Sequence, residues 1–397
     1  MKYISEFRDH RLARKIAFRI SRIARSIDRE IRLMEVCGTH ALAILKFAIK
    51  ELLPPNINLV SGPGCPVCVT PNQYIDKACI YMQRGFLVTT FGDMMRVPGS
   101  QSSLVREKSR GGKVKIVYSP VDALRIAKSY PQEKVIFLGI GFETTAPTVA
   151  ASILMAEEDG IKNFMVLCGH KLIPPAMKTL VENKRVRIDG FLCPGHVSAI
   201  IGSEAYEFLT RDYNIPCVVT GFEPLDILQG INLLVSQIYR KEAIVENEYT
   251  RIVTQKGNLK AKDLMKRVFK VSDSYWRGMG VIKSSGLSIN EDYSRYDAQL
   301  HYPVEITSFK EKKGCRCGEV LQGLIEPREC ILFGDPCNPS NPFGPCMVSV
   351  EGVCNIYYRF GSDHKAEKLN ARSNSLSSRK RRKVNSGTYK GYLSSPF

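Results

Sequence analysis

The most constraining feature of this chain is a unit that repeats between residues 33 and 244. Each unit consists of a short apolar run, a Gly-rich turn and a longer amphipathic segment. Such cycling is typical of βα units, in which buried parallel strands alternate with helices. The sequence therefore predicts an α/β fold with parallel sheets. The expected strands are 31–36, 57–60, 85–90, 113–118, 134–139, 163–168, 188–192 and 216–220.

Eight strands are more than one small lobe needs. The tripeptide G-F-E occurs at Gly141 and at Gly221, in each case between an expected strand and an expected helix. We therefore expect two related parallel-sheet βα lobes divided near Ser129, followed by a small cysteine-rich domain and a basic, disordered tail. The expected boundaries are 1–128, 129–244, 245–358 and 359–397.

The formal net charge of +18 is concentrated at the two ends of the chain. Residues 361–397 hold nine Lys/Arg and two acidic residues, and the first 35 residues hold ten and five. The N-terminal basic residues alternate with isoleucines, which predicts a helix with a solvated basic face. Because no basic patch interleaved with aromatic residues and no binding motif is present, we expect no nucleic-acid partner.

Hydropathy gives an expectation about location. No apolar run approaches the roughly 18 residues that a membrane helix needs. The N-terminal M-K-Y-I-S-E-F-R has no apolar core of the kind found in secretory signals. We therefore expect a cytoplasmic protein without membrane contact.

Cys65 and Cys68 form C-P-V-C inside a Gly/Pro turn directly after an expected strand. In parallel sheets the carboxyl ends of the strands line the ligand crevice, so this turn should lie at the site. A C-x-x-C in that position usually performs thiol–disulfide chemistry. The alternative is half of a zinc site, although no second C-x-x-C is present to complete it.

Cys37 stands between an expected strand and an expected helix, and His40 follows three residues later. A sulfur at a helix N-terminus meets a positive partial charge, which should lower its pKa and favour metal binding or nucleophilic attack. Alone, such a pair is more often packing than chemistry. Beside the C-x-x-C turn, the functional interpretation is favoured.

Further turns could add acids and bases to the same face. Glu143 and the threonines Thr144 and Thr145 lie in G-F-E-T-T-A-P, and His170 and His196 lie in later turns. We expect the threonines to cap a helix. For Glu143 and His196, helix capping and catalysis remain equally open.

Six of the thirteen cysteines lie between Cys315 and Cys354. Thiolates interrupted by Gly and Pro suit a soft metal centre, and four of them would complete an iron–sulfur cluster. A disulfide framework is less favoured in so large a chain without secretory features. The C-x-C start and the irregular later gaps match neither paired zinc spacing nor a ferredoxin run, so spacing alone leaves iron–sulfur and zinc open.

Taken together and in order, the motifs resemble the HypD family of [NiFe]-hydrogenase maturation factors over about residues 10 to 358. The resemblance implies two lobes facing a cleft and a third domain with a [4Fe-4S] cluster. It also implies a scaffold that, with a HypC-like chaperone, holds iron while cyanide from a HypE-like donor and carbon monoxide are added. The matching motifs are M-E-V-C-G-T-H, S-G-P-G-C-P-V-C-V-T, F-G-D-M-M-R-V-P-G, G-F-E-T-T-A-P-T, L-C-P-G-H-V-S, G-F-E-P-L-D-I-L and Y-W-R-G-M-G.

The resemblance also assigns residues. Cys37 matches the family's iron-binding cysteine, and Cys65 and Cys68 match its redox pair. The cluster ligands carried over are Cys317, Cys330, Cys337 and Cys354, with Cys315 and Cys346 left over. The alternative function is a free-standing iron–sulfur thiol–disulfide oxidoreductase, which would act without a partner that delivers iron.

Overall fold

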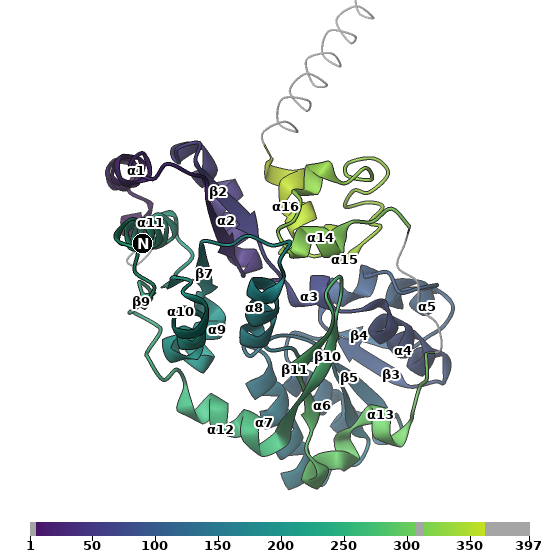
Figure 1. Cartoon of the computed structure of the whole chain (residues 1–397). Helices are drawn as coiled ribbons and strands as arrows, with labels where there is room; N and C mark the ends of the chain where they lie inside the picture. The colour runs from purple at the N-terminus through teal and green to yellow at the C-terminus, as the bar shows by residue number, and fades with distance from the viewer. Residues whose placement is uncertain (1–4, 307–312, 362–397) are drawn as a thin grey trace, which may run out of the picture.

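The computed structural model describes residues 5–306 and 313–361, and it contains two parallel sheets (Figure 1). Each of the eight expected strands forms, so the α/β class is confirmed. In order across it, the first sheet contains β2 (Ile57–Ser61), β1 (Ile31–Glu35), β7 (Gly190–Pro194), β8 (Cys217–Thr220) and β9 (Val245–Asn247). The second sheet contains β4 (Val114–Ile116), β3 (Leu87–Thr90), β5 (Val135–Gly139) and β6 (Phe164–Cys168).

The two sheets share a strand order. In each, the second strand in sequence lies outside the first, and the third and fourth follow on the other side. The expected division near Ser129 does not coincide with this arrangement, because β3 to β6 form one sheet across that point. The chain leaves the first sheet after β2, builds the whole second sheet, and returns to pair β7 with β1.

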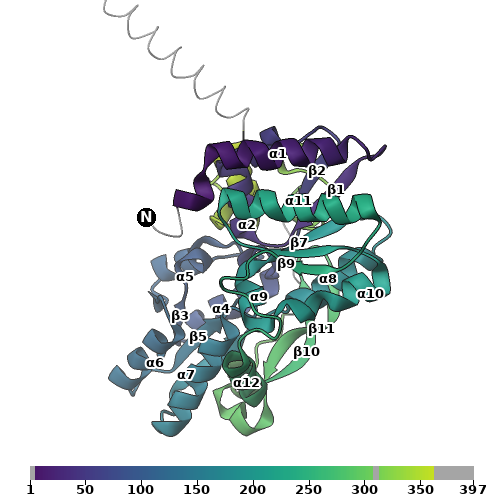
Figure 2. The same ribbon diagram turned by 90° about the vertical axis from the view of Figure 1, so that its left-hand side faces the viewer.

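Helices cover the faces of the sheets because both sheets are rich in buried apolar side chains. All five residues of β5, V-I-F-L-G, are buried. Over the first sheet, α1 (His10–Ala24) lies alongside α11 (Pro224–Arg240), as Figure 2 shows. The expected basic N-terminal helix is therefore present as α1; its Ile20 is buried while its arginines are exposed.

A β-hairpin and shorter helices accompany the two sheets. Two long strands, β10 (Phe269–Trp276) and β11 (Gly280–Ile289), form an antiparallel hairpin that packs against α8. The other helices include α2 (Gly38–Lys46), α3 (Pro66–Val69), α4 (Asn72–Gln83), α5 (Leu104–Ser109), α6 (Pro120–Ser129), α7 (Ala146–Glu158), α8 (Ile173–Glu182), α9 (Gly195–Ile201) and α12 (Leu259–Val268), together with the 3-10 turn η3 (Gly92–Arg96).

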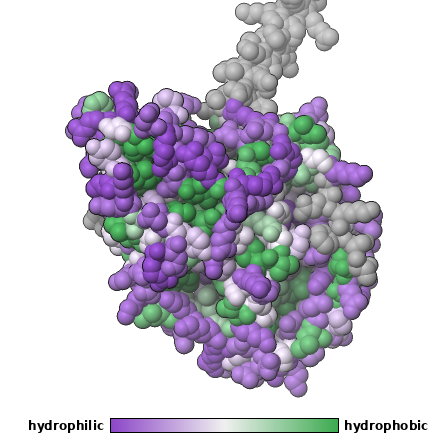
Figure 3. All heavy atoms as spheres, in the orientation of Figure 1, coloured by the Kyte–Doolittle hydropathy of each residue, from purple (hydrophilic) through white to green (hydrophobic). Residues whose placement is uncertain are grey.

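The cysteine-rich segment folds into short helices at the top of Figure 1. They are α14 (Cys317–Leu321), α15 (Pro345–Val348) and α16 (Val353–Phe360); α15 packs against α3, and α16 packs against α2. The expected basic tail, 359–397, lies outside the described residues from residue 362 onward. Within 5–306 and 313–361, none of the helices has the length and apolar character needed to cross a bilayer. Figure 3 shows a mainly hydrophilic face interrupted by hydrophobic patches.

Candidate functional site

The strand order predicts one ligand crevice on each sheet. In an open parallel sheet, ligands bind where the connections from two adjacent strands run in opposite directions. In the first sheet that point lies between β1 and β7, and in the second it lies between β3 and β5. The turn with Cys37 follows β1 and the turn with His196 follows β7, so two predicted site residues border the first crevice.

Cys37 is buried and occupies the N-cap position of α2. Its backbone N–H donates to Oε2 of Glu35, 2.8 Å away. The helix N-terminus was expected to lower the pKa of the thiol, and that expectation is wrong. Burial raises the pKa of Cys37 to about 12, and the backbone N–H of His40 offsets this only in part. A metal ion bound here would have to displace the proton.

The C-P-V-C turn lies directly against Cys37. The structure joins Cys65 and Cys68 in a disulfide, with their Cα atoms 5.2 Å apart. The N–H of Gly38 donates to the carbonyl of Gly64 at 3.2 Å. A Cβ at Gly64 would lie 2.1 Å from the Cys37 nitrogen, so only glycine permits this approach. Two motifs that are 28 residues apart in sequence thus form one surface.

The ring of His40 points to the end of β8. Its Nε2 lies 3.0 Å from the carbonyl oxygen of Gly221 and 3.1 Å from Oγ1 of Thr220. Burial lowers the pKa of His40 to about 4, so the ring is neutral and Nε2 carries the proton that Gly221 accepts. Among the described residues no partner meets Nδ1, which is therefore a free acceptor beside the Cys37 turn.

His196 borders the same crevice from the β7 side. It is exposed, and its ring stacks on Phe222 with the centroids 4.0 Å apart. The ring of His40 contacts the same phenylalanine at 5.1 Å. The structure therefore brings His40 and His196 together around Phe222, as the sequence predicted for residues of one crevice.

Glu143 lies on the second sheet, after β5. Its Oε1 accepts the N–H of Ile173 at 3.0 Å, so it caps α8, whereas the sequence suggested its own helix, α7. Burial raises the pKa of Glu143 to about 7, and the side chain borders a hollow of about 350 Å³.

Thr145 occupies the N-cap position of α7, but its side chain makes no capping hydrogen bond. Its hydroxyl donates instead to the carbonyl of Ile140, so the expectation that this threonine caps the helix is wrong.

His170 follows β6 on the second sheet and is buried. Burial lowers its pKa from 6.5 to about 3. Between about pH 3 and pH 6.5, His170 binds a proton in the unfolded chain but not in the folded chain. The free energy of unfolding therefore falls as the pH falls through this range. From pH 7 to pH 5, we expect wild type to lose about 2 kcal/mol more unfolding free energy than His170→Asn.

Urea denaturation at the two pH values measures this difference. The variant His10→Asn, in the exposed first turn of α1, is the matched control and should follow wild type. Equal losses in wild type and His170→Asn would show that the buried ring does not contribute.

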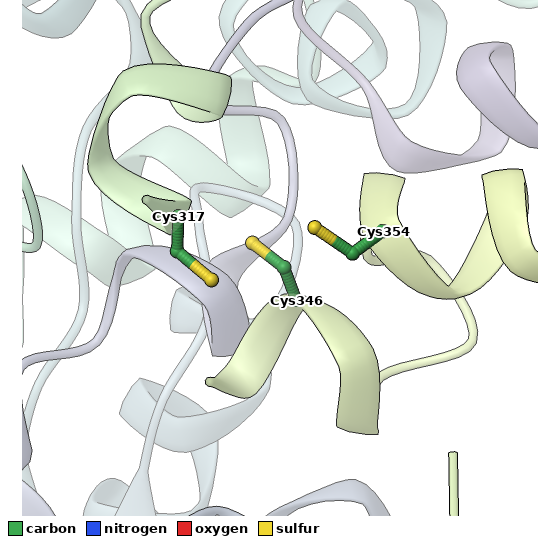
Figure 4. Close-up of side chains that lie close together, drawn as sticks. All are labelled: Cys317, Cys346 and Cys354. Atoms are coloured by element: carbon green, nitrogen blue, oxygen red, sulfur yellow. The ribbon is translucent and has the colours of Figure 1, made fainter. Parts of the chain in front are cut away.

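The sulfurs of Cys317, Cys346 and Cys354 all lie within 4.8 Å of one another. Figure 4 shows them converging from α14, α15 and α16. Hydrogen bonding with the Cys317 and Cys354 thiols lowers the pKa of Cys346, which favours its thiolate form. Three convergent buried thiols fit a thiophilic metal centre.

This grouping departs from the ligands expected from the resemblance. Cys317 and Cys354 come together as expected, but the third member is Cys346, which had been left over. Cys330 is only partly buried, and its Sγ lies 3.8 Å from the carbonyl oxygen of Gly314. Cys337 is buried and accepts the N–H of Phe343 at 3.4 Å. The Sγ of Cys315, also left over, lies 3.2 Å from that of Cys317.

Arg277, in Y-W-R-G-M-G, ties the C-P-V-C helix to the hairpin. It is buried; its N–H donates to Val69 at 2.9 Å, and its Nε donates to Thr70 at 3.1 Å. Its positive charge also lowers the pKa of Cys346. The C-P-V-C segment therefore adjoins both the Cys37 turn and the cysteine-rich helices, because Gly64, just before it, accepts the N–H of Gly38 and α3 packs against α15.

Comparison with known proteins identifies the family to which the chain belongs. The family model HypD, described as "Hydrogenase formation hypA family", matches residues 11–361. The hydrogenase maturation factor HypD of Azotobacter vinelandii is 46% identical over 374 residues, covering 92% of this chain and 98% of the relative. The chain belongs to the HypD family.

Other HypD relatives agree across bacteria and archaea. The HypD factor of Escherichia coli K12 is 45% identical over 366 residues, covering 91% of this chain and 98% of the relative. A putative hydrogenase expression/formation protein of Methanocaldococcus jannaschii is 43% identical over 352 residues, covering 89% and 98%. Membership confirms the resemblance inferred from the motifs.

Some residues of this HypD site were not singled out from sequence. Glu35 contacts the Cys37 backbone, Arg277 supports α3, and Glu351 accepts the Thr39 hydroxyl at 2.9 Å. Glu35 and Arg277 stand inside motifs that carried the family match, and Glu351 stands between two cysteines of the cysteine-rich end. A charged residue within such a motif is the signal that could have identified them.

Proposed function

We propose that this chain is a hydrogenase maturation scaffold that holds iron at Cys37 while the Fe(CN)2CO group of [NiFe]-hydrogenase is assembled. The observation that carries the proposal is the contact of the Cys37 turn with the disulfide turn, with the three-cysteine group behind it. The iron is cargo in this scheme, and a thiolate suits a low-spin iron carrying cyanide and carbon monoxide.

Partners supply what the chain lacks. We propose that a HypC-like chaperone offers further ligands to the iron at Cys37, and that a HypE-like protein donates cyanide. The names of the relatives support work in hydrogenase maturation. Infrared spectroscopy of the anaerobically purified complex with the chaperone tests the proposal, because bound cyanide and carbonyl give their own stretching bands. A complex that contains iron without these bands would contradict it.

The chain's own residues prepare the iron site. Cys37 provides the sulfur, which loses its proton as the metal binds. Neutral His40 provides a free acceptor nitrogen next to that turn. His196, which is exposed and stacks on Phe222, can meet an incoming partner. Glu143 lies after β5 on the other sheet, and its acid–base role stays a proposal.

The three-cysteine group fits a resident [4Fe-4S] cluster. We propose Cys317, Cys346 and Cys354 as ligands, with Cys315 as the fourth because its sulfur lies beside that of Cys317. Such a cluster supplies single electrons when bound. The family-derived alternative uses Cys330 and Cys337 in place of Cys346 and Cys315.

We expect the Cys65–Cys68 disulfide to be reversible. A C-x-x-C pair closes a short loop, and α3 lies next to the proposed cluster, so the pair should exchange electrons with a redox buffer. Mass spectrometry after thiol blocking should find the pair oxidised in air and reduced under anaerobic dithiothreitol. Cys193, buried in β7, is the control and should stay a free thiol in both. A pair that is blocked to the same extent in both samples would remove the redox role.

The free-standing oxidoreductase is less well supported. Attack on a disulfide of another protein requires a sulfur that a bulky substrate can reach, whereas dithiothreitol is a small molecule. Here Cys65 is 2% exposed and Cys68 is 0% exposed. We also propose that the chain works in the cytoplasm, where thiols such as its eleven free cysteines stay reduced.

A further inference from the structure

The segment between Cys346 and Cys354 touches both ligand crevices. The hydroxyl of Ser349 donates to Oδ2 of Asp93 at 3.3 Å, and Asp93 belongs to the turn after β3. Two residues later, Oε1 of Glu351 accepts the Thr39 hydroxyl at 2.9 Å, in the turn after β1. Three consecutive residues, 349–351, therefore bridge the two sheets at the points where their crevices open.

Close packing makes the contact with the first crevice stiff. A Cβ on Gly38 would lie 2.5 Å from the Glu351 carbonyl oxygen and 2.6 Å from its Cβ. Gly38 directly follows Cys37, so the Glu351 backbone rests on the residue next to the proposed iron ligand. A shift of Glu351 by even a fraction of an ångström must move this turn or open a gap beside it.

The segment is also held internally. The N–H of Glu351 donates to the Ser349 hydroxyl at 3.2 Å, and the N–H of Gly352 donates to the Ser349 carbonyl at 3.0 Å. The buried Asn355 amide donates to the carbonyl of Met347 at 2.9 Å, which ties α15 to α16. Ser349 itself is 1% exposed. The segment is therefore a compact unit and can transmit a displacement at either end.

We propose that residues 349–351 act as a strap that couples the three-cysteine group to the Cys37 turn. When a metal centre holds Cys346 and Cys354 at fixed separation, Glu351 is pressed against Gly38 and Thr39, and the Cys37 turn is closed. When the centre is absent, the strap loosens and Cys37 becomes accessible. Glu351 and Thr39 are positioning residues in this proposal, which rests on the proposed function because it takes the cluster and the Cys37 site from it.

The coupling has a chemical use. Iron should be held at Cys37 only when the proposed electron source is in place, and a Cys37 turn that is fixed in position only in cluster-bearing protein provides that order. The contact is steric and hydrogen-bonded, so it requires no electron transfer. It is therefore separable from the redox role of Cys65 and Cys68.

The test measures how fast iodoacetamide alkylates Cys37, by mass spectrometry, in anaerobic full-length protein without partner or added iron. Removing the cluster from wild type should speed the reaction about tenfold, the size expected for loss of one hydrogen bond. In Thr39→Val, which keeps the shape but loses the donor, both forms should react fast and the ratio should fall to about one. Cys217, buried in β8, is the internal reference and should not change.

Two further variants make the result decisive. Thr39→Ser keeps the hydroxyl, so the ratio of alkylation rates between cluster-free and cluster-bearing protein should return to the wild-type value. If Thr39→Val acted only by loosening α2, the hydroxyl of Thr39→Ser would not restore this ratio. Glu351→Ala removes the acceptor of the same hydrogen bond and should give the same ratio of about one. It replaces Thr39→Val as the test if Thr39→Val folds poorly. All should retain the visible absorption of the cluster.

Equal alkylation rates in cluster-bearing and cluster-free wild type would overturn the strap. So would a wild-type ratio in both Thr39→Val and Glu351→Ala. The proposed function fails by a different measurement: cluster-bearing protein with its chaperone would show no cyanide or carbonyl bands, whatever the alkylation rates.

Discussion

The Cys37→Ala variant is expected to retain no iron beyond that of its cluster when it is purified anaerobically with a HypC-like chaperone. The substitution removes the sulfur that directly follows β1, and among the described residues the nearest cysteines in the adjoining turn, Cys65 and Cys68, are joined in a disulfide. Loss of a ligand should lower metal retention by more than the 10- to 100-fold seen for supporting residues, roughly to background. Iron analysis and infrared spectroscopy of the complex measure the loss.

The fold should survive this change. One buried sulfur is removed from a turn, which costs about 1 kcal/mol in a core of this size. The absorption of the cluster should persist, because the three-cysteine group is a separate site. Cys168→Ala is the matched control, since Cys168 also ends a parallel strand, β6, but lies on the other sheet. Cyanide and carbonyl bands in Cys37→Ala equal to those of Cys168→Ala would end the assignment of Cys37.

Single replacement of Cys317, Cys346 or Cys354 by alanine is expected to remove the broad absorption that a [4Fe-4S] centre shows at about 400 nm. Each of these sulfurs faces the other two, so its loss exposes an iron to water. The cysteine-rich segment should also loosen, because metal binding contributes folding free energy there. Thermal unfolding of the anaerobic protein, followed together with the absorption, records both effects.

Cys330→Ala is the matched control because that residue is partly exposed and its sulfur lies outside the three-cysteine group, 3.8 Å from the carbonyl oxygen of Gly314. It should keep its colour, whereas Cys315→Ala should lose it. The opposite pattern, with colour lost in Cys330→Ala and kept in Cys346→Ala, would return the ligand set to the one expected from the motifs. Zinc as the sole bound metal would instead remove the electron-transfer part of the proposed function.

Local pattern was enough to identify the strands and the family. An apolar run followed by a Gly-rich turn predicted β1 to β8 because burial and turn formation depend on neighbouring residues. The same reasoning placed Cys37 before a helix and Cys65 in a turn, and both positions are confirmed. Long ordered motifs also survive changes elsewhere in the chain, which is why the HypD resemblance could be read before any geometry.

Properties that depend on distant neighbours could not be read in this way. The helix N-terminus beside Cys37 suggested a lowered pKa, but burial by other elements raises it. Glu143 suggested a cap for α7, but the amide of Ile173, thirty residues away, is the one it accepts. In both cases a contact with a segment distant in the sequence outweighs the effect of the neighbouring residues.

By itself, the sequence determined which segments become strands, which turns carry chemistry and which family the chain belongs to, because each follows from residues close together or from motifs in order. Only the tertiary structure decided that β7 returns to pair with β1, that Cys346 joins Cys317 and Cys354, and that Glu351 rests on Gly38. These contacts join segments far apart in the chain. Their geometry is fixed by how whole elements pack, and no local spacing encodes it.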